Sequence, residues 1–363
     1  MKKKLLFFGY TLDMGGAEKV MVDFLKVLQP HYDITLALLQ AKGVLMEDLP
    51  QGIRVIQLRN GLLPYLLFRY IPFFRKRKIN KIANEEDYHA AIGFLEGRSA
   101  TWVADIKKPI RRLAWVHTDV DHFDIGVCAE EALDSYSKMD AVITVAEHSK
   151  NSFLRKFGSS VHSGDELYNL IDEESILRKS TEAVEPNHCF TFVNVGRMSP
   201  PKRQDRLVEI AHRLKAEGFS FAIQILGGGS EEEKIRQMVK EKDVEDVVQL
   251  KGMVLNPYPY IKQADCVVVS SDFEGYSVVI KEALLLGKAI ISTDVSGVRE
   301  VFEDNKYGIV TERTTDDLYQ NMRAALCGEI DPKAIETRLQ TFDCSNKAII
   351  DKLFSIIEGE SIC

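Results

Sequence analysis

Short runs of β-branched and aromatic residues alternate along the chain with stretches whose apolar residues recur at helical spacing. Such runs predict buried strands, and their alternation with helices predicts parallel sheets covered by helices on both faces. The first series of predicted strands is Lys4–Gly9, Asp33–Leu39, Ile53–Leu58, Ala90–Leu95, Arg112–His117 and Ala141–Ala146. The second series is Cys189–Val195, Phe221–Leu226, Val247–Lys251, Cys266–Ser271, Ala289–Thr293 and Gly308–Thr311. The pattern therefore predicts an α/β protein in which one plan occurs twice.

A polar, acidic segment separates the two series. It lies between Asn169 and Asn187 and has the composition of a linker. A chain of 363 residues has room for two domains of common size. We predict two Rossmann-like domains, residues 1–176 and 177–345, that face each other across a cleft, the usual place for a ligand. The helical pattern within residues 346–363 is predicted to pack back on the N-terminal domain.

Composition excludes several classes of protein. Hydrophobic residues make up 45% of the chain and charged residues 28%, as in ordinary globular proteins. The net charge of −7 provides no global attraction for nucleic acid. The six cysteines form no C-x-x-C pair, which fits a reducing compartment, and no apolar run is long enough to span a bilayer. We expect a cytoplasmic protein without a nucleic-acid partner.

Glycines and cations follow strands at several places. Gly15 and Gly16 precede a predicted helix, where free N–H groups can bind an anion, and Gly227 to Gly229 follow a strand of the second domain. Arg197 and Lys202 lie between a strand and a helix, and both can reach a diphosphate. Plain turns and solvated surface charges are the alternative interpretations.

Two glutamates give the sharpest signal. Glu274 lies in a loop after a buried strand, whereas Glu282 lies further on, in a helix predicted to start near Ser277. The two carboxylates can therefore bind different parts of one long ligand, while the N–H groups of residues 277–279 bind a phosphate. An acidic first helical turn is the alternative, and it explains Glu274 but not Glu282.

Together these segments resemble the retaining GT-B glycosyltransferases of family GT4. The resemblance covers nearly the whole chain in the expected order. It rests on Glu274-x7-Glu282, Gly196-Arg197-x4-Lys202, Gly15-Gly16-Ala17-Glu18 and the stretch from Leu250 to Tyr258 ahead of Ala264-Asp265.

The resemblance implies a role for each matching residue. Arg197 and Lys202 would hold the donor diphosphate, Glu282 would bind the ribose, and Glu274 would lie near the donor sugar. The implied donor-binding residues are Gly15, Gly16, Arg197, Lys202, Gly228, Lys251, Val254, Ser277, Val278, Val279 and Glu282, and the implied catalytic residues are His117 and Glu274. His117 matches the active-site histidine of the family; a merely hydrogen-bonded histidine at a strand end is the alternative.

The implied function is that of a hexosyltransferase in cell-surface polysaccharide synthesis. It would move a hexose or a derivative, with retention, from a nucleotide sugar to a saccharide or lipid-linked saccharide. UDP as the nucleotide rests on its frequency in the family. Because Arg197 and Lys202 would neutralise the leaving diphosphate, we expect no cofactor and no metal.

Three other functions stay open at this stage. Asp119-Val-Asp121 is a D-x-D pair, with which GT-A glycosyltransferases hold Mn²⁺ beneath a diphosphate. A nucleotide-sugar epimerase and an inactive sugar-nucleotide-binding partner are the others. Sensitivity to chelators tests the first, and product analysis with and without an acceptor tests the second.

Residues 59–83 combine basic and aromatic side chains and contain no acidic residue. This composition fits a helix at an anionic membrane surface, where lipid-linked saccharides are found. We therefore consider peripheral contact with the inner face of the membrane. The alternative is a core-facing helix with a solvated basic side.

Overall fold

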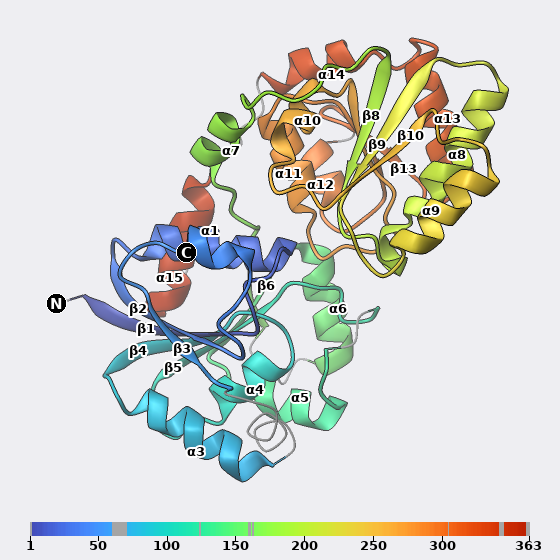
Figure 1. Cartoon of the computed structure of the whole chain (residues 1–363). Coiled ribbons are helices and arrows are strands. Elements are labelled where there is room, and N and C mark those ends of the chain that lie inside the picture. Colours follow the sequence, from blue (N-terminus) through green and yellow to red (C-terminus); the bar gives the residue numbers. More distant parts are fainter. Residues whose placement is uncertain are drawn as a thin grey trace. The chain divides into compact units, whose positions relative to one another are not determined.

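The structure is a computed structural model that describes residues 2–59, 71–122, 125–158, 161, 163–303, 305–340 and 345–360. The chain divides into two compact units (Figure 1). The N-terminal unit comprises Met1–Leu170 and Asn346–Cys363, and the C-terminal unit comprises Ile171–Ser345. Each unit is built around its own parallel sheet.

The N-terminal unit contains a seven-stranded sheet of order β3-β2-β1-β4-β5-β6-β7, in which all paired strands are parallel. Its strands are β1 Lys3–Gly9, β2 Tyr32–Leu38, β3 Arg54–Gln57, β4 Tyr88–Gly93, β5 Arg111–Val116, β6 Ala141–Thr144 and β7 Ser163–Glu166. In β1, Leu5, Leu6, Phe7 and Phe8 are all fully buried, as expected of a central strand covered on both faces.

Helices cover both faces of this sheet (Figure 1). They are α1 Gly16–Leu28, η1 Val44–Asp48, α3 Pro72–Ala83, α4 Arg98–Ala104, α5 Ala129–Tyr136, α6 Glu147–Phe157 and α15 Lys347–Glu358. On the face of α1, Phe24 packs against Trp115 with ring centroids 4.5 Å apart, and Trp115 packs against Phe94 at 4.7 Å. This aromatic cluster lies directly beneath the carboxyl end of β5.

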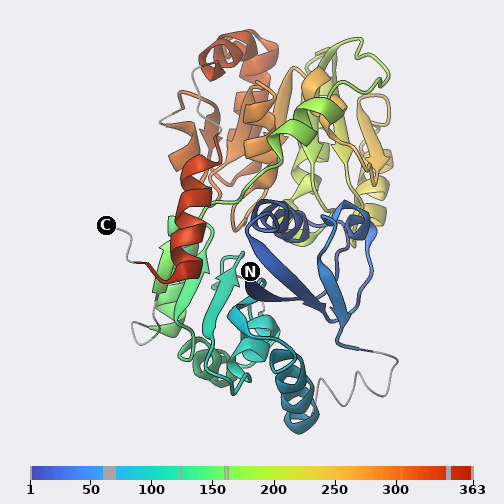
Figure 2. The same cartoon turned by 90° about the vertical axis from the view of Figure 1, so that its left-hand side faces the viewer.

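The last helix, α15, belongs to the N-terminal unit although it follows the whole C-terminal unit in sequence (Figure 2). The Tyr32 hydroxyl donates to Glu358 at 2.7 Å, and the Arg111 side chain donates to the Ile356 carbonyl at 3.0 Å. Phe354 stacks on Tyr32 at 5.9 Å. These contacts fix α15 to β2 and β5.

The C-terminal unit contains a six-stranded parallel sheet of order β10-β9-β8-β11-β12-β13. Its strands are β8 Phe190–Val195, β9 Phe221–Leu226, β10 Val248–Gly252, β11 Cys266–Val269, β12 Ile290–Thr293 and β13 Ile309–Thr311. The predicted α/β class, with one strand plan occurring twice, is confirmed. The predicted series lacked only β7.

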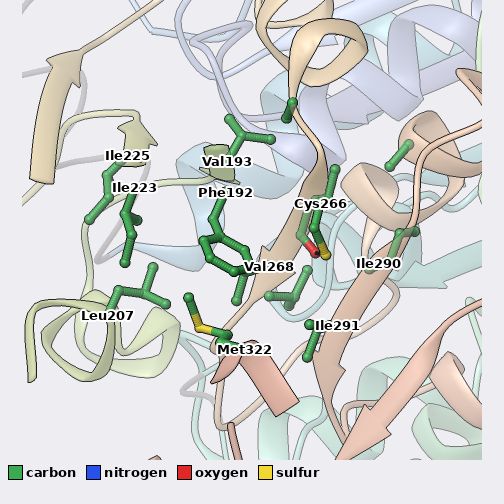
Figure 3. Packing of buried hydrophobic residues seen from close by; sticks show 14 of the residues in the cluster. Phe192, Val193, Leu207, Ile223, Ile225, Cys266, Val268, Ile290, Ile291 and Met322 are labelled. Atoms are coloured by element: carbon green, nitrogen blue, oxygen red, sulfur yellow. Dashed lines mark hydrogen bonds between the residues drawn. The ribbon is translucent and has the colours of Figure 1, made fainter. Parts of the chain in front are cut away.

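The helices of the C-terminal unit are α7 Glu173–Lys179, η2 Pro200–Lys202, α8 Gln204–Ala216, α9 Glu232–Glu241, α10 Tyr258–Gln263, α11 Val278–Leu285, α12 Val298–Phe302, α13 Thr315–Leu326 and α14 Pro332–Leu339. Figure 3 shows Leu207 of α8 and Met322 of α13 packed beside Phe192 and Val268 of the central strands. All four side chains are fully buried. This core fixes the ends of β8 and β11, where the candidate site begins.

Candidate functional site

The loop after β8 is held by a neighbouring glycine loop. The N–H of Gly196 donates to Leu226 and that of Met198 donates to Gly228, both at 2.9 Å. Gly227 has φ +140°, and a Cβ there would lie 2.0 Å from the Gly196 carbonyl oxygen. Because only glycine permits this conformation and this approach, the glycine loop fixes the backbone that carries Arg197.

Lys202 and Glu274 form a close ion pair. The Lys202 Nζ donates to both carboxylate oxygens of Glu274, at 2.6 and 2.7 Å. The Ser271 hydroxyl donates to the same carboxylate at 2.7 Å. The Glu274 side chain is only 11% exposed, and its desolvation is offset by this cation and this hydroxyl.

A second set of charges fixes the two loops that carry this pair. Asp272 accepts from Arg203 at 2.9 Å and from Arg206 at 2.7 Å. The Ser270 hydroxyl donates to the Lys202 carbonyl at 2.8 Å, and the Asp272 N–H donates to the Pro201 carbonyl at 2.8 Å. Three contacts from the loop after β8 and one from the first turn of α8 therefore hold the loop after β11, and the geometry of the Lys202–Glu274 pair is set in advance.

Arg197 differs from Lys202. Its side chain is exposed, and no ion pair joins it to any residue in the part of the chain that the structure describes. An exposed guanidinium without a carboxylate partner keeps its full set of donors for an anion.

Glu282 lies on α11 and is 4% exposed. It accepts a hydrogen bond from the Tyr258 hydroxyl at 3.1 Å. Ser277, which precedes the helix, makes no side-chain cap, so the first-turn N–H groups are not satisfied by its hydroxyl. Val278 and Val279 pack partly against the core of the unit.

The end of β10 and the segment after it carry two of the predicted donor-binding residues. Lys251 lies within β10 and is half-buried, and Val254 packs partly against the core. Its neighbours Met253 and Leu255 are 66% and 73% exposed. The structure thus places a partly apolar surface at this end of the sheet.

In the N-terminal unit, Gly15 and Gly16 precede and open α1. Gly15 has an extended backbone that any residue adopts, and a Cβ on Gly16 would meet nothing within 4 Å. Packing among the described residues therefore does not demand glycine at position 16. A side chain there would instead fill the space next to the N-terminus of α1.

His117 directly follows β5 and is 7% exposed. Its ring lies 4.6 Å from Phe94 and stacks on Trp115 at 5.7 Å. Both ring nitrogens are buried, and neither makes a hydrogen bond within the described residues. Burial lowers the pKa of His117 to about 3, so the imidazole is neutral at physiological pH.

Glu96 was not among the predicted site residues. Its carboxylate accepts the backbone N–H of His117 at 3.0 Å, and its carbonyl accepts from the Tyr10 hydroxyl at 3.1 Å. Burial raises the pKa of Glu96 above its ordinary value. Its position directly after the predicted strand Ala90–Leu95 was the signal in the sequence that marks it.

The D-x-D pair is engaged in other contacts. Asp119 accepts from His122 at 2.8 Å and from His148 at 3.2 Å, and Asp121 pairs with Arg155 at 2.7 Å. Among the described residues, no group of three or more His, Cys, Asp or Glu side chains has a metal-binding arrangement. The two aspartates therefore do not form the exposed pair that the D-x-D hypothesis requires.

The structure brings together Lys202 and Glu274 but holds Glu282 by a separate contact. Two further residues support this half of the site, Ser271 and Tyr258. Ser271 is the last residue of the predicted strand Cys266–Ser271, and Tyr258 lies in the stretch from Leu250 to Tyr258 that carries part of the family resemblance. The roles that the sequence predicts for Lys202, Glu274 and Glu282 stay predictions.

Comparison with known proteins finds similarity to sugar transferases. Residues 176–339, within the C-terminal unit, match the family described as Glycosyl transferases group 1. An N-acetylgalactosamine-N,N'-diacetylbacillosaminyl-diphospho-undecaprenol 4-alpha-N-acetylgalactosaminyltransferase from Campylobacter jejuni is 26% identical over 93% of this chain and 94% of its own length. A poly(ribitol-phosphate) alpha-N-acetylglucosaminyltransferase from Staphylococcus aureus is 26% identical over 62% of this chain and 45% of its own.

Solved structures share the fold. Alr3699/HepE of Anabaena, in complex with UDP and glucose, has a TM-score of 0.80 at 18% identity, over 97% of this chain and 98% of that one. The sucrose-phosphate synthase of Thermosynechococcus elongatus has a TM-score of 0.78 at 15% identity, over 99% of both chains.

Proposed function

From the match to the group 1 glycosyltransferases and the shared GT-B fold, we propose that the chain moves a hexose or hexose derivative from a nucleotide sugar to a saccharide or lipid-linked saccharide. We further propose that the donor is UDP-linked, that the anomeric configuration is retained and that the product enters cell-surface polysaccharide. The N-terminal unit would bind the acceptor, and the C-terminal unit the nucleotide sugar.

One observation carries the proposal: two cations stand at the carboxyl end of β8, and one of them pairs with Glu274 from the end of β11. Lys202 lies 2.6 Å from Glu274, whereas Arg197 is exposed. A leaving diphosphate gains negative charge as its bond to the sugar breaks, and fixed cations stabilise that charge. Binding of a neutral sugar alone would not require these two cations.

The reaction follows from these roles. The bond between the anomeric carbon and the donor phosphate oxygen breaks, and the acceptor oxygen bonds to the same face of that carbon. The acceptor proton passes to the departing phosphate oxygen. Arg197 and Lys202 would stabilise the diphosphate, Glu274 would stabilise the positively charged sugar, and Glu282 would hold the ribose hydroxyls.

The names of the relatives support the class of acceptor. The relative from Campylobacter jejuni is named for a diphospho-undecaprenol-linked saccharide, and that from Staphylococcus aureus for poly(ribitol-phosphate). Both names contain a phosphate group in the acceptor. This common property supports a saccharide or lipid-linked acceptor for this chain.

Titration calorimetry with UDP and GDP, each in excess EDTA, tests the proposal. We expect UDP to bind without a metal and Arg197→Ala to weaken it about ten- to a hundredfold, because charge-assisted contacts are each worth about 1.5 to 3 kcal/mol. A matched control is Arg236→Ala, on the exposed side of α9, where the arginine pairs with Glu232. Binding that requires Mn²⁺ would contradict the proposal.

Product analysis then separates transfer from the other chemistries. UDP sugars would be incubated with and without saccharide acceptors, and the products identified by mass spectrometry and NMR. A new glycoside formed only with an acceptor supports transfer, whereas a change in the sugar of the recovered donor indicates an epimerase. Donor binding without either product indicates an inactive binding partner.

We also propose that α3 contacts the inner face of a membrane. Ile71, Phe73 and Phe74 are 40%, 65% and 44% exposed, and Arg77 and Lys81 lie exposed further along the helix. Tyr65, Phe68 and Tyr70, which contributed to the prediction, lie outside the described residues. Within the described part of the chain, no helix has the length and apolarity to cross a bilayer.

Sedimentation with vesicles of phosphatidylglycerol and phosphatidylcholine tests this contact. We expect the wild type to bind anionic vesicles and Phe73→Ser with Phe74→Ser to release it, because both the apolar contact and the charge attraction are needed. Leu177→Ser, at an exposed leucine of α7, is the control. Equal sedimentation of all three proteins would contradict the membrane contact.

A further inference from the structure

Glu96 lies where the order of strands reverses in the sheet of the N-terminal unit. In the order β3-β2-β1-β4-β5-β6-β7, the chain extends from β1 to one side as far as β3 and then continues on the other side from β4. Open parallel sheets bind ligands at the carboxyl ends of the two strands that flank such a reversal, here β1 and β4. Glu96 is the third residue after β4, in the loop at this position.

Side chains from two other segments fix the backbone around Glu96. The Tyr10 hydroxyl, from the loop after β1, donates to the Glu96 carbonyl at 3.1 Å. The N–H of Gly97 donates to the Tyr136 hydroxyl at 3.0 Å. Gly97 has φ +72°, and a Cβ there would lie 1.8 Å from the Ile125 carbonyl oxygen, so this position requires glycine. The Glu96 carboxylate is therefore carried by a backbone that is set before any ligand binds.

The Glu96 carboxylate extends to the end of the neighbouring strand. Its Oε2 accepts the backbone N–H of His117, the residue that follows β5, at 3.0 Å. The His117 ring is 7% exposed, and within the described residues neither of its nitrogens has a hydrogen-bond partner. Because a buried polar atom without a partner is costly, these nitrogens indicate that a ligand or a water completes the place beside Glu96.

Glu96 differs from other partly buried carboxylates in having no counterion. Glu274 pairs with Lys202 at 2.6 Å, and Asp105 of the N-terminal unit pairs with Arg75 at 2.7 Å. In the described part of the chain, no lysine, arginine or histidine side chain forms an ion pair with the half-buried Glu96. Desolvating a carboxylate without a counterion costs stability, so packing alone does not explain a glutamate at this position. Binding of a ligand does.

The charges around Glu96 favour one chemical class of ligand. Burial raises the pKa of Glu96; the N–H of His117 opposes this effect, and the negative charge of Glu18 in the first turn of α1 adds to it. Two carboxylates beside a neutral imidazole repel a phosphate or any other anion. An ionised carboxylate only accepts hydrogen bonds, so its complement is a donor such as a sugar hydroxyl. The surroundings of Glu96 thus favour a neutral ligand that carries hydroxyl groups.

We propose that Glu96 binds a hydroxyl group of the acceptor saccharide, next to His117 in the N-terminal unit. The inference rests on the proposed glycosyl transfer and adds a residue to which the family resemblance assigned no role. The carboxylate accepts a hydrogen bond from the hydroxyl and so orients the saccharide. Glu96 takes up no proton in this role, because the acceptor proton passes to the departing phosphate oxygen.

Steady-state kinetics test this contact, with UDP sugars as donors and octyl glycosides of hexoses and N-acetylhexosamines as acceptors, in excess EDTA. We expect Glu96→Gln to raise the acceptor KM about five- to tenfold, because a neutral hydrogen bond replaces a charge-assisted one. The donor KM and the affinity for UDP should not change. The glutamine amide oxygen still accepts the N–H of His117, so a purely structural role of Glu96 would leave the acceptor KM unchanged as well.

Glu86→Gln is the matched control. Glu86 lies just before β4, at the opposite end of the strand from Glu96, and pairs with Lys4. Its substitution should change neither KM.

Deoxy analogues of an accepted glycoside, used as competitive inhibitors of transfer, provide a second comparison. The analogue that lacks the contacted hydroxyl should inhibit the wild type and Glu96→Gln equally, whereas the other analogues should inhibit the variant less. If Glu96→Gln fails to fold, as melting temperature and UDP affinity would reveal, Glu96→Asp replaces it with the same expected rise in the acceptor KM, because its carboxylate is withdrawn by one methylene.

Three results would overturn the role of Glu96: an unchanged acceptor KM, a raised donor KM, or a lower kcat with both KM values unchanged. Failure of the wild type to bind UDP, or to transfer sugar to any glycoside of the panel, would instead overturn the proposed function.

Discussion

The candidate residues of the two units differ in charge and in how they are held. In the C-terminal unit they are ionic: Lys202 pairs with Glu274, and Asp272 joins Arg203 to Arg206. In the N-terminal unit the central residue is His117, a neutral imidazole between aromatic rings with both nitrogens buried. Both sets lie at the carboxyl ends of parallel strands, so the same position in the fold serves two electrostatic environments.

In the proposed reaction, this difference would give the two units different roles. Cations held by carboxylates suit a ligand whose negative charge grows during the reaction. An imidazole that stays neutral suits uncharged hydroxyl groups, and it does not compete with the cations for the diphosphate. If the proposal is right, the fold provides the two positions, while the side chains at the strand ends determine which part of the substrates each position accepts.

The largest effect is expected for Lys202→Ala. It removes a cation from the proposed diphosphate site and leaves Glu274, which is 11% exposed, without its counterion. We expect kcat/KM for the donor to fall by about a hundredfold or more, and the free energy of unfolding to fall by about 1 to 3 kcal/mol. Steady-state kinetics and urea unfolding measure the two losses.

The double variant Lys202→Ala with Glu274→Ala separates the loss of activity from the loss of stability. It should recover much of the stability, because no carboxylate remains without a partner, while activity stays lost. Recovery of activity together with stability would show that the pair is structural and would remove the contrast between the units.

A smaller effect is expected for Arg197→Ala. Because Arg197 is exposed and pairs with no described carboxylate, its loss should reduce kcat/KM about ten- to a hundredfold without lowering the free energy of unfolding. Unchanged donor kinetics would exclude it from the site. A loss of stability equal to that of Lys202→Ala would contradict the difference between the two cations.

The two glutamates should differ in kinetic type. Glu282→Gln should mainly raise the donor KM, about three- to tenfold, because a ribose contact exists in both the ground and the transition state. Glu274→Gln should lower kcat, because its contact strengthens as the sugar becomes positive. If Glu282→Gln lowered kcat and Glu274→Gln raised KM, the assigned roles would be reversed; unchanged kinetics in both would exclude the paired carboxylates.

The smallest effect concerns the pH dependence of stability. The pKa of His117 is lowered to about 3 in the fold, whereas a histidine of an unfolded chain titrates near 6.5. Its contribution is therefore present above pH 6.5 and is lost as pH falls toward 3, where the unfolded chain binds the extra proton. Between pH 7 and pH 4.5 we expect the Tm of His117→Asn to fall by roughly a few degrees less than the Tm of the wild type.

Scanning calorimetry at four pH values measures this slope, with His188→Asn as the exposed control. Between pH 5 and 8 the reaction rates of the wild type and of His117→Asn should depend on pH in the same way, because the His117 ring is neutral throughout. Identical slopes in all three proteins would mean that His117 is not held neutral by burial.

Much of the fold followed from the sequence because its strands are apolar. Leu5 to Phe8 and Val267 to Val269 have no polar residue that competes with a buried strand. The exception, β7, has the sequence Ser-Gly-Asp-Glu and pairs only with β6 at the sheet edge, so neither composition nor alternation marks it. Edge strands are defined by their neighbour more than by their own residues.

The sequence predicted which residues belong to the candidate site but not which of them contact one another. The positions of Lys202 and Glu274 follow from motifs, yet their contact joins residues 72 positions apart and depends on β8 and β11 being neighbours. The hydroxyl of Tyr258 reaches Glu282 only because α10 and α11 pack together. The engagement of Asp119 by His148 likewise depends on the order of β5 and β6, which local sequence does not encode.

The placement of α15 has a consequence for the order in which the protein is made. Residues 171–345 leave the ribosome before Lys347–Glu358, yet α15 completes the N-terminal unit by its contacts with Tyr32 and Arg111. During translation, α15 therefore cannot cover the surface around Tyr32 and Arg111 until more than half of the chain has been added. The C-terminal unit is synthesised without interruption, so on the ribosome the half that emerges first is the half that finishes last.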